Sequence, residues 1–306
     1  MRYWFSVIVI FGLGCAEPFI PETIEEEQLL VVEGRVEAGP SAGPAYVILT
    51  RSVPFSGTLS LERLEELFVN DALVTVDDGL QKIILSELCL EDLPTEIRDA
   101  AAELLGFNPD SVQINACAYV DVLGQVTREI GRSYKLEVRS AETILRAETT
   151  IPSYVGLSDF RWDDPPGEPS DSLARLWVTI DDPPEANYYR YFTGAVDQPI
   201  VSPFASVTND IFFNGQEFEF PLTKGEPRGA EIDPESFGLY TRGDSIVVRW
   251  TTIEESVFDF WNTLEFSANS AGPFSSYTRI ATNVEGGLGV WAGYAVDEYR
   301  LFCPPR

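Results

Sequence analysis

Apolar and polar residues alternate in short runs along most of the chain, and such alternation is typical of β-strands with one buried face. Turn-forming Gly, Pro, Asn and Asp residues separate many of these runs. The pattern predicts strands at Leu29–Glu37, Ala45–Ser52, Ala72–Val76, Lys82–Leu88, Val112–Val122, Ser133–Val138, Leu173–Ile180, Tyr188–Ala195 and Asp244–Thr252. Two tight turns, at Asp77–Gly79 and at Asn214-Gly215 within Asp210–Phe220, predict hairpins whose arms pair with each other.

Apolar residues at helical spacing interrupt the strands in three places. A short helix is expected at Ser60–Phe68 behind a Ser N-cap, and a second at Pro94–Leu105, where Pro lies near the start and Gly106 follows the end. Thr252 and Glu255 have the spacing of a capping box that would open a third helix. Its apolar face would consist of Val257, Phe260, Trp261 and Leu264.

The order of these elements predicts a mainly β protein with two domains. Residues 29–156 are expected to form an immunoglobulin-like or transthyretin-like β-sandwich with helical insertions, and residues 157–306 a second, fibronectin-type sandwich with one helix. The acidic, proline-rich stretch Asp163–Ser172 has no apolar core residue before Leu173 and is interpreted as a linker-like loop. Its dense oxygen ligands also suggest a calcium loop, but no regular ligand spacing supports it.

The first fifteen residues have the pattern of a signal for export and lipid attachment. A single basic residue, Arg2, precedes an apolar run from Trp4 to Leu13, and Gly14 comes directly before Cys15. The run is far shorter than the roughly 20 residues of a membrane-spanning helix. We therefore predict a lipoprotein signal peptide over 1–15, lipidation of Cys15 with acyl chains such as palmitate, and an extended acidic tether over 16–28. An ordinary signal peptide that contains a cysteine is the alternative.

Net charge and the absence of histidine limit the chemistry. The formal charge is −28, and a field this negative disfavours nucleic acid as a partner. Solubility of an exported protein and a cation-binding role would both explain the acidity. Because the chain has no histidine, it has no Ser-His-Asp triad, Cys-His pair or His-ligated zinc. A glycosidase-type carboxylate pair or a Ser-Lys arrangement stays possible, and neither has a local signature.

Three cysteines are left after Cys15. Cys89 and Cys117 flank a short segment and are expected to form a disulfide, as an exported protein allows. Cys303 is the odd cysteine, either free or in competition for one of the other two. No metal site and no cofactor are expected.

The C-terminal stretch carries the most distinctive motif. A Pro273-Phe274 pair is followed by Ile280 and Asn283, and then by Gly286, Gly287, Leu288, Gly289 and Trp291. The glycines predict a turn that needs positive φ or close backbone approach, and Asn283 is expected to bond to nearby backbone. A structural turn before a core strand is one interpretation, and a partner contact by these residues is the other.

This motif resembles the C-terminus of a family of uncharacterised outer-membrane lipoproteins of Bacteroidota, often encoded beside TonB-dependent receptors. Upstream, Leu30–Gly34, the strand with Tyr134, Leu136 and Val138, and Thr150–Pro152 also match. The resemblance implies a non-catalytic accessory protein of a TonB-dependent transporter, anchored by lipid in the outer membrane. Acidic residues after Cys15 resemble export signals that favour the cell-surface face. Three alternatives stay open: a glycan- or peptide-binding module with several of the six tryptophans exposed, an adhesin-like spacer, and an enzyme with two carboxylates in a cleft.

Overall fold

The computed structural model describes residues 28–53, 64–94, 98, 115–141, 143–196, 198–226, 233–269 and 279–306. Within these ranges the chain folds into three β-sheets and one long helix, α3 (Glu255–Asn269), with a short 3₁₀ helix at Leu90–Asp92. The expected mainly β class is confirmed. Among the described residues, no helix combines the length and the hydrophobicity needed to span a bilayer.

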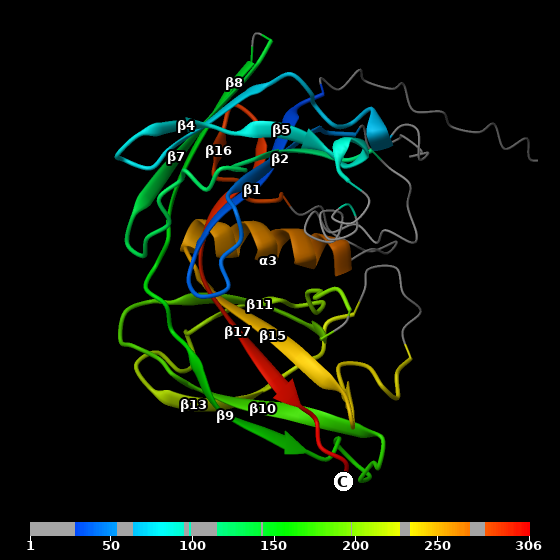
Figure 1. Ribbon diagram of the computed structural model, residues 1–306. Helices are drawn as coiled ribbons and strands as arrows, with labels where there is room; N and C mark the ends of the chain where they lie inside the picture. The colour runs from blue at the N-terminus through cyan, green and yellow to red at the C-terminus, as the bar shows by residue number, and fades with distance from the viewer. Residues whose placement is uncertain are drawn as a thin grey trace, which may run out of the picture.

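The largest sheet has eight strands and runs through the whole molecule (Figure 1). Its order is β12 (Val207–Asn209), β11 (Tyr188–Ala195), β15 (Ser245–Ile253), β17 (Leu288–Phe302), β1 (Leu30–Ala38), β2 (Tyr46–Arg51), β6 (Cys117–Val120) and β5 (Ser86–Cys89). The 15-residue strand β17 is central: it pairs in parallel with β1 up to Ala295, and in antiparallel with β15 from there to Phe302. Strand β17 therefore joins β1, the first described strand, to β15 within one sheet.

Two smaller sheets pack on one face of the large sheet, one at each end. The five-stranded sheet has the order β16 (Val284–Glu285), β8 (Thr143–Thr150), β7 (Ser133–Ser140), β3 (Leu73–Asp77) and β4 (Lys82–Ile84). The other consists of β13 (Glu217–Leu222), β10 (Leu173–Asp181), β14 (Tyr240–Thr241) and β9 (Leu157–Asp163), which pairs with β10. Each encloses a separate apolar core, because alternate residues of the facing strands point inward.

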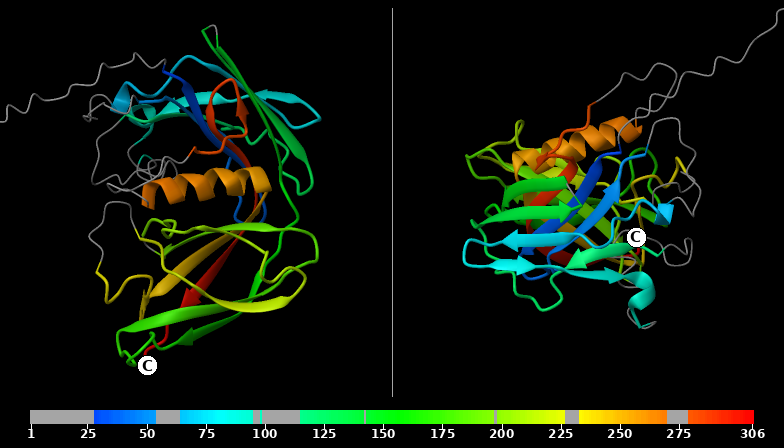
Figure 2. Two further views of the ribbon diagram at one scale, coloured as in Figure 1. Left: turned by 180° about the vertical axis from the view of Figure 1, so that it is seen from behind. Right: turned by 90° about the horizontal axis from the view of Figure 1, so that it is seen from above.

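Helix α3 lies across the opposite face of the large sheet (Figure 2). Its residues Val257, Phe260 and Trp261 pack against Val290 and Tyr294 of β17, which confirms the predicted apolar face of the helix. The predicted capping box is wrong: Thr252 belongs to β15, where its hydroxyl accepts the N–H of Val155. Strand β15 pairs along its full length with β11, and this pairing keeps Thr252 extended.

The expected division into two domains stays a prediction. Strands from both sides of residue 157 share the large sheet, so the two halves are not built on separate sheets. The acidic stretch at 163–172 connects the neighbouring strands β9 and β10 of one sheet. Arg242 stabilises this stretch: it donates hydrogen bonds to the carbonyls of Ser170 and Leu173 and forms an ion pair with Asp164. The stretch is thus an intrasheet connection.

One predicted hairpin and one predicted strand differ from the structure. The Asn214-Gly215 turn forms, with Gly215 at φ 68°, but the predicted hairpin is wrong because β12 pairs with β11 while β13 pairs with β10. Phe213 turns inward and stacks on Phe218, which breaks the extended run. The predicted strand Lys82–Leu88 divides at buried Leu85 into β4 and β5, which belong to different sheets. The predicted helix at Pro94–Leu105 falls almost wholly outside the described residues, as does most of the one at Ser60–Phe68.

A buried charge cluster joins β1 to β15 on the α3 face of the large sheet. Glu37 is fully buried, and its carboxylate lies 2.6 Å from Arg249 and accepts the N–H of Gly43 at 2.8 Å. Arg35 Nε lies 2.9 Å from the same carboxylate, close enough for an ion pair but misaligned for a hydrogen bond. Burial acts to raise the pKa of Glu37, but Arg35, Arg249 and Gly43 outweigh it and lower that pKa. Glu37 therefore stays ionised inside the protein.

Candidate functional site

The C-terminal motif forms the turn between β16 and β17. The side chain of Asn283 pairs with the backbone of Trp291, donating to its carbonyl at 2.8 Å and accepting its N–H at 3.0 Å. An amide side chain thus takes the place of a neighbouring strand at the start of β17. Thr282 supports the same turn by donating its hydroxyl to the carbonyl of Gly289 at 2.7 Å.

Glycine is required in this turn for two different reasons. Gly286 and Gly289 have φ values of 84° and 105°, which lie in the left-handed region that favours glycine. A Cβ on Gly289 would lie 1.8 Å from the carbonyl oxygen of Val32, so the backbones of β17 and β1 approach too closely for any side chain. Gly287 is similarly crowded, with a Cβ position 2.7 Å from the carbonyl oxygen of Leu30.

Trp291 lies in the core between the two sheets. It is fully buried and donates its indole N–H to the carbonyl of Tyr134 on β7 at 3.0 Å. The motif therefore joins the five-stranded sheet to the large sheet. Pro273 and Phe274, which begin the motif in the sequence, lie outside the described residues, and so does Cys15.

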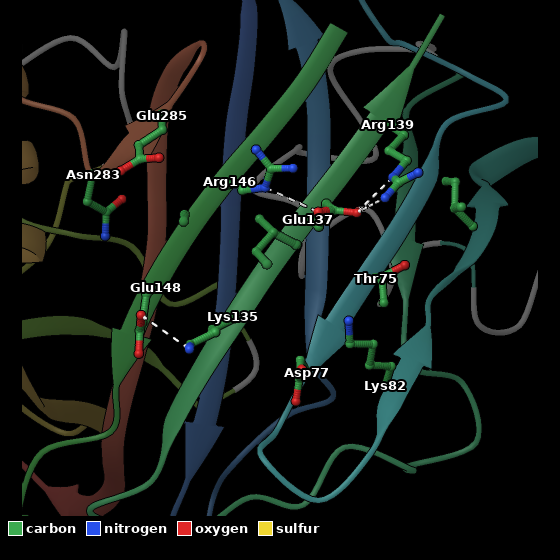
Figure 3. Close-up of a pocket in the computed structure, with 13 residues that line it drawn as sticks. Thr75, Asp77, Lys82, Lys135, Glu137, Arg139, Arg146, Glu148, Asn283 and Glu285 are labelled. Carbon is green, nitrogen blue, oxygen red and sulfur yellow. Dashed lines mark hydrogen bonds and ion pairs between the residues drawn. The ribbon is translucent and has the colours of Figure 1, made fainter. Parts of the chain in front are cut away.

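A groove with a volume of about 670 Å³ lies beside this turn, on the outer face of the five-stranded sheet (Figure 3). Outward-facing side chains of β3, β4, β7, β8 and β16 line it, most of them charged or polar. The lining residues are Leu73, Thr75, Asp77, Lys82, Lys135, Leu136, Glu137, Arg139, Arg146, Ala147, Glu148, Asn283 and Glu285.

The charges in the groove are largely paired with each other. Glu137 lies between two arginines, 2.7 Å from Arg139 and 3.2 Å from Arg146 (Figure 3). The hydrogen bond from Arg139 is the main cause that lowers the pKa of Glu137, and Arg146 adds to it. Lys135 and Glu148 form a looser pair at 4.0 Å. Glu137 is therefore ionised and engaged with both arginines.

The groove also differs in charge from the chain as a whole. Four basic and four acidic residues line it, so its formal charge is zero, whereas the chain carries −28. A charge-balanced surface can approach another macromolecule without the repulsion that the rest of an acidic surface creates.

Two of the three cysteines that follow Cys15 form the expected disulfide. Cys89 and Cys117 form a disulfide between β5 and β6, which confirms the predicted pairing. Among the described residues, these two and Glu87 form the one group of three potential metal ligands, but both sulfur atoms are used in the disulfide. Cys303 is free and fully buried, and burial raises the pKa of its thiol.

The tryptophans of the described residues do not form an exposed platform. Trp250, Trp261 and Trp291 are buried, and Trp162 and Trp177 are half-buried. Trp4 lies outside the described residues. This arrangement weighs against stacking of a sugar on several tryptophans.

Residues 16–300 match the model of a protein family described as a domain of unknown function, DUF4249. The chain belongs to the DUF4249 family. No curated protein matches this DUF4249 chain. The match begins directly after Cys15, at the first residue of the predicted tether.

The groove residues were not identified from the sequence as a site, although the signal was present. The run SYKLEVRS at 133–140, which extends the predicted strand 133–138 by two residues, alternates apolar and charged residues. This alternation places Lys135, Glu137 and Arg139 on one exposed face. Nothing in the local pattern indicates that Arg146 and Glu285 come from other strands to the same surface. That neighbourhood depends on the strand order.

Proposed function

We propose that this DUF4249 protein is a non-catalytic, lipid-anchored accessory protein of the outer membrane that acts with a TonB-dependent transporter. Cys15 would carry the lipid, residues 16–28 would provide reach, and the β-rich body would bind the transporter or its nutrient at the cell surface. The two halves of that body would correspond to an immunoglobulin-like and a fibronectin-like sandwich built on one common sheet.

The groove on the five-stranded sheet is the observation that carries this proposal. It combines an exposed volume of about 670 Å³ with a balanced set of charges on a chain of net charge −28. A transporter that meets this surface gains paired polar contacts without a large electrostatic penalty. The absence of histidine from the sequence favours binding over catalysis.

A peptide-binding or glycan-binding module is the second candidate, because the groove is large enough for a small ligand. A peptide is favoured over a glycan, since the described tryptophans are buried or half-buried while the groove offers charged side chains. An adhesin-like spacer would use neither the groove nor a stable partner.

The test is a pull-down from native outer membranes in mild detergent, with mass spectrometry of the recovered proteins. Three variants are compared with the wild type: Cys15→Ala, the groove double variant Arg139→Glu/Arg146→Glu, and Arg300→Glu as a matched control. Arg300 is an exposed arginine on β17 outside the groove.

We expect the wild type and the Arg300→Glu variant to recover a TonB-dependent receptor, and the groove variant to recover much less of it. Loss of membrane attachment in Cys15→Ala would support the lipid anchor independently. Equal recovery by the groove variant would refute the groove as the docking surface, and recovery of lipoprotein alone would favour the spacer.

A further inference from the structure

A second hollow is lined by residues of β10 and β13 and of two connecting loops. These two strands lie at the end of the molecule opposite the five-stranded sheet (Figure 1). The volume of the hollow is about 390 Å³, and its lining combines apolar residues with three polar ones, Arg175, Thr223 and Glu235. Four prolines, Pro165, Pro166, Pro221 and Pro234, form much of its wall. Phe237 and Leu239 add apolar surface to it.

Arg175 on β10 is the one basic residue in this lining. Within the described ranges it makes no ion pair and no side-chain hydrogen bond. Its guanidinium lies over the ring of Trp177, with 5.9 Å between Cζ and the ring centroid. Asp163 lies opposite Arg175 in the strand register, but its carboxylate binds Arg161 at 2.6 Å. The guanidinium of Arg175 therefore keeps its donors available in a strongly acidic protein.

The wall of the hollow limits what else a ligand can be. Proline has no N–H, so four prolines give a rigid surface with few hydrogen-bond donors. An apolar body lies well against prolines and Phe237, while a carboxylate matches the planar fork of an arginine.

We propose that this hollow binds an organic carboxylate with an apolar body, with Arg175 holding the carboxylate and the proline wall covering the body. The site is independent of the groove on the five-stranded sheet. Its ligand is either a free aromatic or aliphatic acid or the C-terminal end of a peptide, which present the same chemistry to Arg175.

Isothermal titration of the full protein tests the site with defined probes. The acids are 3-phenylpropionate and the tetrapeptide Ala-Ala-Ala-Phe with a free C-terminus. The neutral controls are 3-phenylpropionamide and the amidated tetrapeptide. Arg175→Gln is compared with Arg300→Gln, a matched control because Arg300 is exposed and lies outside the hollow.

We expect saturable binding of at least one acid below about 10 mM and a loss of affinity of tenfold or more in Arg175→Gln. The amides should bind correspondingly weakly, and Arg300→Gln should bind like the wild type. The acid that binds more tightly identifies the source as a free acid or a chain end. Absence of saturable binding by both acids, equal binding of the amides, or unchanged affinity in Arg175→Gln would each overturn the proposal. Since these readouts do not involve a transporter, they are separate from the test of the groove.

Discussion

Substitution of Glu37 by Gln should destabilise the protein more than any substitution of a surface charge. Glu37 is fully buried and has two arginine neighbours, Arg35 and Arg249, from different strands. Gln keeps the shape of the side chain and an acceptor for the N–H of Gly43, but it removes the negative charge. Arg249 is then left in a largely buried position with one carboxylate fewer.

The expected cost follows from what the remaining partners can compensate. Removal of one member of a buried ion pair typically costs about 3–5 kcal/mol. Arg249 keeps a 2.7 Å contact with Glu298 and a hydrogen bond to the carbonyl of Ser41, so it is not left without partners. We therefore expect the lower end of the range, about 3 kcal/mol.

Urea unfolding, followed by tryptophan fluorescence and by circular dichroism, measures this difference. Glu137→Gln is the matched control, because Glu137 also has two arginine partners but lies on the exposed face of the five-stranded sheet. Exposed pairs are worth about 1 kcal/mol or less, so the control should change little. A loss below about 1 kcal/mol in Glu37→Gln, or equal losses in both variants, would refute the reasoning that burial decides the value of these charges.

Three further predictions concern the turn, the pH dependence and the disulfide. Gly289→Ala should destabilise by more than about 3 kcal/mol in urea titration, because its Cβ would clash with the carbonyl of Val32; a loss below about 1 kcal/mol would contradict the required close approach. Burial acts to raise the pKa of Asp78, but backbone N–H donors outweigh it and lower the pKa to about 2. As the pH falls from 5 to 2, the free energy of unfolding of the wild type should therefore decrease by about 2 kcal/mol more than that of Asp78→Asn. Parallel curves of unfolding free energy against pH for the two proteins would contradict this. Reduction of the Cys89–Cys117 disulfide, 28 residues apart in sequence, should lower the free energy of unfolding by about 3–4 kcal/mol, and an unchanged midpoint in reductant would disprove a stabilising role.

Several features were readable from local sequence alone. The strand Tyr188–Ala195 was predicted with the bounds that the structure has, because alternation of side chains is a property of the strand itself. The pairing of Cys89 with Cys117 and the apolar face of α3 were also predicted correctly. The turn chemistry of Asn283 followed from the capacity of a short amide side chain to bond to nearby backbone.

Other features were decided by contacts between residues far apart in the chain. The parallel pairing of β1 with β17 joins residues more than 250 positions apart, and no local pattern specifies such a partner. The predicted hairpin at Asn214-Gly215 is wrong because the strands on either side of the turn pair with strands of different sheets: β12 pairs with β11, and β13 pairs with β10. A strand pattern indicates which face is buried but not which strand lies beside it.

The candidate sites belong to this second group. The charges of the groove come from separate strands, and Asp163, opposite Arg175 in the strand register, pairs with Arg161 instead. The sequence by itself determined most of the strands, the disulfide and the residues of the C-terminal turn, since these depend on neighbours along the chain. The tertiary structure decided the shared sheet, the buried charge of Glu37 and both candidate binding surfaces, because packing and strand order bring their residues together.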